Sequence, residues 1–298
     1  MKLKAALFSS RKAVVGLAVV VAFALLAALG PLLVGDPTDF VGTPLEPPSR
    51  AHWLGTTGQG QDVLWQTVAG ARPTLLLGFG VGFLVVAIGT LVGSVAGYLG
   101  GRVDALLNLV INVFLVMPAL PLMVVLAAYL SPGLGTMGLV LTIAGWAWSA
   151  RVARASAMSL RSRDFVAAAV VTGEGALRIV VREILPVMGP LVASMFVGAS
   201  LYAIAAQVGL EFLGLGDSRR VTWGSALYFA RNDAALITGS WWTFVPAGVC
   251  IGVLGGALAL LASAFDEIGD PRLRVEGSYR RRAHGGALGD APTVVLRS

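Results

Sequence analysis

Charged side chains are scarce in this chain. Only 13% of its 298 residues are Asp, Glu, Lys or Arg, while 56% are hydrophobic, and the mean hydropathy is +0.81. Soluble domains carry about 25% charged residues, so this composition predicts a membrane protein. The net charge of +6 does not indicate nucleic-acid binding, because the basic residues gather at loop ends beside apolar runs, as membrane topology requires.

Cysteine and histidine are nearly absent. Cys250 is the only cysteine and lies inside an apolar run, so no intramolecular disulfide can form and a buried free thiol is expected. The two histidines, His52 and His284, fall far apart in different loops. This spacing argues against a histidine-based metal site, and no metal site is predicted.

Lysine is confined to positions 2, 4 and 12. A nucleotide-binding P-loop needs a lysine directly after its glycine-rich turn to reach the phosphates. The chain therefore cannot be a conventional P-loop ATPase, and no catalytic residue is predicted in it. If ATP drives its activity, a partner chain hydrolyses that ATP.

Long apolar runs are what the sequence does contain. A membrane-spanning helix needs about 20 predominantly apolar residues. The segments that qualify are 13–34, 73–98, 105–130, 134–150, 187–210 and 243–265. The first could instead be a cleavable signal peptide, but its apolar core exceeds the usual ~7–15 residues, so a retained helix is preferred. The sequence thus predicts an all-α membrane protein with six transmembrane helices.

Basic residues set the predicted orientation. Lysines and Arg11 precede the first helix, which puts the N-terminus (1–12) inside the cell by the positive-inside rule. Six crossings then place residues 160–186 and the tail 266–298 inside as well, with extracytoplasmic loops at 35–72 and 211–242 and a core at 73–265. The tail is glycine- and arginine-rich without apolar periodicity, and it is predicted to be disordered.

Helices two to six contain no ionisable residue well inside their predicted bounds. Proton-coupled carriers usually hold such groups at mid-membrane, so a carboxylate-relay transporter is disfavoured, whereas a passive pore is not. The polar groups at depth are Asn108, Asn112 and Gln207. Each is a candidate for lining a substrate path or for hydrogen bonding to a neighbouring helix.

Glycines recur at every fourth position in two of these helices. Gly89, Gly93 and Gly97 lie on one face of the second helix, and the sixth helix repeats the pattern with Gly248, Gly252 and Gly256. Small residues on one face let helix backbones approach closely in lipid. The stripes predict either ordinary close packing or a sliding interface around a pathway.

The stretch from residue 163 to 186 connects two apolar segments. Its helix-forming run 165–171 is broken by Gly173, and a second amphipathic turn leads to Leu185-Pro186. Small alanine side chains allow a short helix to seat deeply in a groove of another protein. The alternative is a helix lying on the membrane surface, which the alanines would anchor poorly.

This stretch resembles the "EAA" coupling loop in membrane subunits of binding-protein-dependent ABC importers. Ala167, Ala168 and Ala169 occupy the Glu-Ala-Ala positions, Gly173 follows after three intervening residues, and Leu185-Pro186 has the expected spacing. The motif glutamate is absent, and Glu183 stands where an apolar residue is usual. The resemblance implies contact with an ATPase through the following residues: Asp164, Phe165, Ala167, Ala168, Ala169, Gly173, Leu185 and Pro186.

Three further islands resemble the permeases of dipeptide, oligopeptide and nickel importers, in the style of their C-type subunit. The first runs from His52-Trp53 through Asp62 to Gly70-Ala71-Arg72, with Thr57 replacing the usual aspartate and Gln61 the usual arginine. The others are Glu211 to Gly216 followed by Thr222-Trp223-Gly224, and Asp270-Pro271-Arg272. All keep the family's order across about residues 12–275.

The resemblance implies the transmembrane domain of a type I ABC importer in a bacterial cytoplasmic membrane, surrounded by lipid. The implied partners are a second homologous permease, two ATPase subunits that bind ATP and Mg²⁺, and an extracytoplasmic binding protein. Docking of the binding protein is assigned to Trp53, Asp62, Glu211 and Trp223. Peptides are the expected cargo, with nickel, oligosaccharides or another small solute as alternatives. A passive channel or a non-transporting scaffold subunit is the alternative of a different class.

Overall fold

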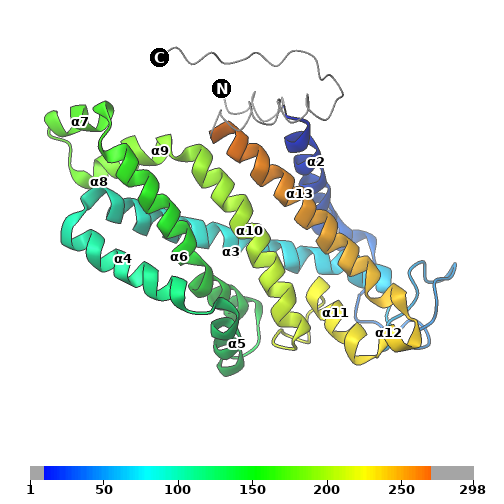
Figure 1. Cartoon of the computed structure of the whole chain (residues 1–298). Helices are drawn as coiled ribbons and strands as arrows, with labels where there is room; N and C mark the ends of the chain where they lie inside the picture. The colour runs from blue at the N-terminus through cyan, green and yellow to red at the C-terminus, as the bar shows by residue number, and fades with distance from the viewer. Residues whose placement is uncertain (1–9, 270–298) are drawn as a thin grey trace, which may run out of the picture.

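The computed structural model describes residues 10–269, whose regular secondary structure is helical, with no β-strand among them (Figure 1). The long helices are α2 (Arg11–Leu33), α3 (Val63–Leu99), α4 (Gly101–Val116), α5 (Ala119–Tyr129), α6 (Leu134–Arg161), α10 (Gly189–Phe212) and α13 (Val245–Gly269). The short ones are α7 (Asp164–Val171), α8 (Ala176–Ile179), α9 (Leu185–Val187), α11 (Trp223–Asn232) and α12 (Ala235–Thr238).

Membrane-spanning potential is clear for part of this set. Helices α2, α3, α10 and α13 are long and apolar enough to cross a membrane, and the pair α4–α5 raises the total to five if it forms one bent span. Helix α6 has 28 residues but does not reach the same apolarity, because it continues past Ala150 and carries Arg151, Arg154 and Arg161. The described residues therefore contain four or five candidate spans by length and composition.

The single helix predicted over 105–130 is wrong. The chain bends by 85° between α4 and α5. Pro118 explains the break, because a proline disfavours the helical conformation of the residue before it, and Met117 is indeed extended with ψ 129°. Other boundaries also move: α3 begins at Val63, before Pro73, and α13 continues to Gly269.

The glycine stripe on α3 is a close-packing face. A Cβ at Gly89, Gly93 or Gly97 would collide with the backbone of α6, so the C-terminal part of α3 packs closely against α6. Gly78 and Gly82 play the same part against α10. The stripe predicted on α13 differs, because Gly248, Gly252 and Gly256 have no heavy atom within 4 Å of an added Cβ, among the described residues.

Short helices and loops gather at two opposite ends of the long helices (Figure 1). Helices α7, α8 and α9 lie at one end, together with the start of α2 and the end of α13; we name this the α7 end. The loop 35–62 and helices α11 and α12 lie at the opposite end, which we name the α11 end. Residues 1–9 and 270–298, with the predicted tail and the Asp270-Pro271-Arg272 island, fall outside the described range.

Candidate functional site

The connection between α6 and α10 forms a helical hairpin that includes the predicted coupling residues. Helix α7 ends at a Schellman motif, in which the Glu174 N–H donates to the Ala169 carbonyl and the Gly173 N–H to the Val170 carbonyl. Gly173 has φ +80°, a left-handed conformation in which a side chain is strained. The predicted short helix and its glycine break are confirmed.

The hairpin presents one face to the bundle and another to solvent. Val166 of α7 is buried with Ala153 and Ala157 of α6, in a cluster that also includes Ile179 and Ile184. Phe165, Ala169 and Leu185 are half-buried, whereas Asp164, Ala167, Ala168, Gly173 and Pro186 are exposed. Val171 is 87% exposed. An apolar, small-residue surface of this kind is suited to contact with another protein.

The loop before α3 is a compact, polar structure at the α11 end. Asp62 is buried, accepts hydrogen bonds from the backbone N–H groups of Leu64 and Trp65 at the start of α3, and lies 2.9 Å from His52 Nδ1. The Gln61 side chain accepts from Gln66 at 2.6 Å and donates to the Thr38 carbonyl at 3.0 Å. The amide at position 61 thus ties this loop together without the arginine that the family pattern has there.

The two islands after α10 meet at a second polar cluster. Glu211 accepts hydrogen bonds from Thr222 Oγ1 at 2.6 Å and from Gln207 Nε2 at 3.0 Å. Gly224 is required beside them, because a Cβ there would collide with the Glu211 carboxylate. Trp223 is fully buried and donates from Nε1 to the Thr67 carbonyl at 2.9 Å. The cluster fixes α11 against α10 and α3.

The four residues predicted to dock a binding protein differ in their exposure to solvent. Trp53 is 73% exposed at the α11 end. Asp62, Glu211 and Trp223 are buried within the chain, because they cap, bridge and fill the joints between loops and helices. Contacts within the chain explain why these three residues stand at their positions. Of the four, only Trp53 is accessible to a partner protein.

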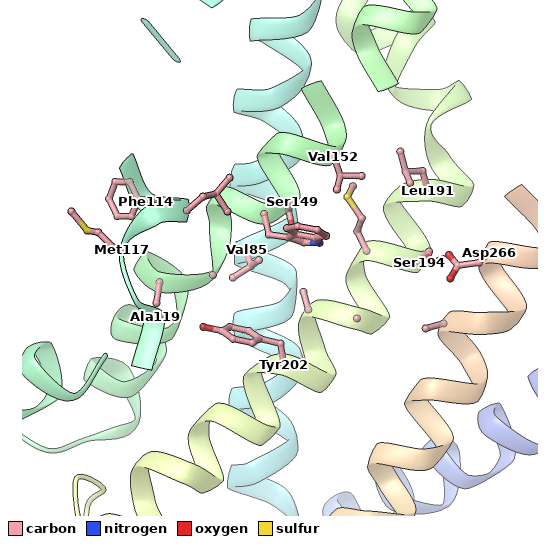
Figure 2. Close-up of a pocket in the computed structure, with 18 residues that line it drawn as sticks. Val85, Phe114, Met117, Ala119, Ser149, Val152, Leu191, Ser194, Tyr202 and Asp266 are labelled. Carbon is pink, nitrogen blue, oxygen red and sulfur yellow. Dashed lines mark hydrogen bonds between the residues drawn. The ribbon is translucent and has the colours of Figure 1, made fainter. Parts of the chain in front are cut away.

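A hollow of about 680 Å³ lies between α3, α4, α6, α10 and α13. Its walls are mainly apolar and include Met117 and Trp148. Val85 of α3 and Tyr202 of α10 also line it (Figure 2). Ser194 and Asp266 lie next to each other at its α7 end (Figure 2). A volume of this size is typical of small-molecule sites, which range over roughly 300–1,000 Å³.

None of the residues predicted to line a pathway borders this hollow. Asn112 accepts a hydrogen bond from Arg151 at 2.8 Å, Gln207 is buried against Glu211, and Asn108 is half-buried on α4. Sequence reasoning missed Tyr202, Ser149 and Asp266, the last because α13 was predicted to end at residue 265. Extending the helical pattern to Gly269 would have put Asp266 on the helix.

Long apolar helices with a hollow between them indicate a membrane-embedded helical protein. The chain belongs to the family described as "Binding-protein-dependent transport system inner membrane component", whose model matches residues 89–275. It is therefore a permease component of the bacterial inner membrane.

Individual relatives extend the likeness over most of the chain. The dipeptide transport system permease protein DppC of Bacillus subtilis is 32% identical over 273 residues, covering 89% of this chain and 83% of its own. The oligopeptide transport system permease protein OppC of the same organism is 30% identical, with 89% and 87% covered. OppC of Mycobacterium tuberculosis strain H37Rv is 35% identical over 235 residues, with 76% and 79% covered.

Proposed function

We propose that this chain is one half of the translocation pathway of an ATP-driven peptide importer, crossing the membrane six times with both termini in the cytoplasm. The crossings are α2, α3, the bent pair α4–α5, α6, α10 and α13. Helix α6 crosses in spite of its arginines because Arg151, Arg154 and Arg161 lie toward its α7 end, where they reach the water interface.

The distribution of basic residues supports the orientation. Basic residues are more numerous at the α7 end than at the α11 end, where the described arginines include Arg50, Arg219, Arg220 and Arg231. The arginines of the α7 end include Arg11, Arg151, Arg154, Arg161, Arg163, Arg178 and Arg182. By the positive-inside rule the α7 end is cytoplasmic.

The exposed face of α7 is the surface that couples this chain to an ATPase partner. ATP and Mg²⁺ are bound by that partner, and this chain has the role of a two-state element. Because ATP binds one arrangement of the partner dimer better than the other, it shifts the equilibrium of the attached helices between inward- and outward-facing forms. The rigid packing of Val166 and Ile179 on α6 would transmit that movement into the bundle.

Peptide cargo is supported by the relatives, which are dipeptide and oligopeptide permeases, and by the mainly apolar hollow. A second, homologous permease would close the pathway. An extracytoplasmic binding protein would deliver cargo at the α11 end, where Trp53 is exposed. Exposed tryptophans are frequent anchors in protein interfaces.

The single observation that carries this proposal is the exposed α7 surface ending in the Gly173 turn, and Gly173→Ala tests it. The complex would be reconstituted in proteoliposomes with its permease partner, ATPases and binding protein, and both ATP hydrolysis and uptake of di- to hexapeptides measured. We expect peptide-stimulated hydrolysis and uptake in the wild type. Because a Cβ is strained at φ +80°, both should fall in the variant.

Gly175→Ala is the matched control. Gly175 is exposed on the same hairpin, has an ordinary φ of −71° and has open space around it, so its substitution should leave coupling nearly intact. Equal activity of the Gly173 and Gly175 variants would contradict the coupling role. Uptake of nickel or oligosaccharides but not of peptides would leave the proposed importer architecture standing and contradict the proposed peptide cargo.

A further inference from the structure

Among the described residues that line the hollow, Asp266 has the only charged side chain. It comes from α13 and lies beside Ser194 of α10, whose hydroxyl donates a hydrogen bond to Asp266 Oδ1 at 2.5 Å (Figure 2). This hydrogen bond holds one carboxylate oxygen of Asp266 in place at the α7 end of the hollow. The rest of the lining consists of apolar side chains and a few hydroxyl groups. A few polar groups on an apolar wall are the usual means of orienting a ligand.

The next residue of the same helix has a different environment. Glu267 pairs with Lys12 at 2.7 Å and does not line the hollow. Within residues 10–269, the ion pairs include none to Asp266. Two adjacent carboxylates therefore do different things: one joins α13 to α2, and the other gives the hollow a negative charge.

We propose that Asp266 receives the α-ammonium group of the transported peptide at the cytoplasmic end of the hollow. This inference rests on the proposed function and adds a residue that determines cargo specificity. A negative charge in a concave site with apolar walls raises the local concentration of cations. The apolar walls formed by Trp148, Val152 and Leu191 would accept the apolar side chains of the peptide.

The charge complementarity is specific to one end of a peptide. A free amino terminus carries a positive charge at neutral pH, whereas an N-acetylated terminus carries none. Since Asp266 itself is exposed, solvent screens the interaction, and ion pairs of this kind change an equilibrium by about two- to fivefold. The expected effect is thus a preference among cargoes rather than complete loss of transport.

The charge of the hollow can be measured without any binding protein. Met195 lines the hollow, and Cys250, the only native cysteine, does not, so a Met195→Cys, Cys250→Ala complex carries one thiol in this chain's hollow. Its modification rates with a cationic and an anionic methanethiosulfonate reagent are compared in proteoliposomes at low salt. Asp266→Asn should lower the cation-to-anion rate ratio about two- to fivefold.

Glu267→Gln is the matched control, since it removes the same charge one residue away from a side chain outside the hollow. It should leave the ratio close to that of the parent complex. An unchanged ratio in Asp266→Asn, or an equal fall in both variants, would overturn the assignment.

Cargo recognition is tested on the same thiol. Tripeptides with free and acetylated amino termini are compared for protection against a neutral maleimide. In the parent, the free form should protect at a lower concentration, and Asp266→Asn should remove that difference. In Asp266→Asn, the cation-to-anion rate ratio could fall while the free and acetylated tripeptides still differ in protection. Asp266 would then contribute to the electrostatic potential of the hollow without binding cargo, and the proposal would be wrong.

Uptake measurements separate this inference from the proposed function. A parent complex that imports no peptide contradicts the peptide-importer proposal itself. Import of peptides with the same preference for a free amino terminus in the parent and in Asp266→Asn contradicts only the role of Asp266.

Discussion

Arg154 of α6 and Asp104 of α4 form a two-pronged ion pair, with Arg154 Nε 2.5 Å and Nη2 2.7 Å from the two carboxylate oxygens. Both side chains are mostly shielded from solvent. The pair joins the first turn of α4 to the arginine-bearing half of α6. It lies beside the joint where α3 turns into α4 through Gly100 and Gly101, both at positive φ.

The Arg154–Asp104 pair predicts coupled stability effects. Asp104→Asn and Arg154→Gln should each lower the melting temperature of the complex, and the double variant should lose less than the sum of both. Bidentate geometry strengthens such pairs, so a coupling free energy of about 1 kcal/mol is expected. Thermal unfolding of the single and double variants measures it, and strict additivity would contradict the prediction.

The α3 glycine stripe predicts a difference between two chemically identical substitutions. Gly93→Ala forces a Cβ against the Ala150 carbonyl of α6, and overpacking of this kind costs about 1–3 kcal/mol. Gly252→Ala meets open space on α13 and should be neutral or slightly stabilising, since alanine favours helices. Thermal stability of the purified chain compares them, and equal losses would contradict the packing argument.

Substitutions of two tryptophans at the α11 end are expected to have different effects. Trp53→Ala removes an exposed side chain, so it should weaken affinity for the binding protein while leaving the melting temperature unchanged. Trp223→Ala removes a buried side chain and its bond to Thr67, and should destabilise the chain by about 3–5 kcal/mol. Binding assays and thermal unfolding separate the two effects; unchanged binding in Trp53→Ala would argue against docking at this residue.

The environment of Asp233 should make the free energy of unfolding depend on pH. Burial raises the pKa of its carboxyl above the ordinary 3.8, and a hydrogen bond from the Gly58 backbone opposes that rise only in part. The ionised form is therefore disfavoured in the folded state, and the stability cost grows as pH rises above the unfolded pKa. Asp233→Asn should stabilise the chain more at about pH 7 than at about pH 4.

Asp36 serves as the control for that experiment, because its effect on stability should change with pH in the opposite direction. A hydrogen bond from the Thr38 hydroxyl, aided by the Thr38 backbone N–H, lowers the pKa of its carboxyl. Its contribution to stability is present above the unfolded pKa and is lost as pH falls through the folded pKa. Asp36→Asn should therefore destabilise slightly at neutral pH and less in acid. The same pH trend in both variants would contradict these assignments.

Local chemistry determined much of this protein at the level of sequence. Apolar runs near the length of a bilayer fixed the membrane class and the approximate positions of the helices. Gly173 fixed the end of α7, because glycine is the residue that adopts φ +80° without strain. The order of short motifs was enough to indicate the permease family before any contact was known.

Tertiary structure decided which polar residues are structural and which line the hollow. Asp62, Glu211 and Trp223 were predicted from the sequence to contact a binding protein, but they are buried and form hydrogen bonds to residues 10, 11 and 156 positions away. Asp266 looked like part of a tail, yet α13 brings it beside Ser194, 72 positions away. Such contacts depend on how separate helices pack, and the local periodicity of a sequence does not contain that information.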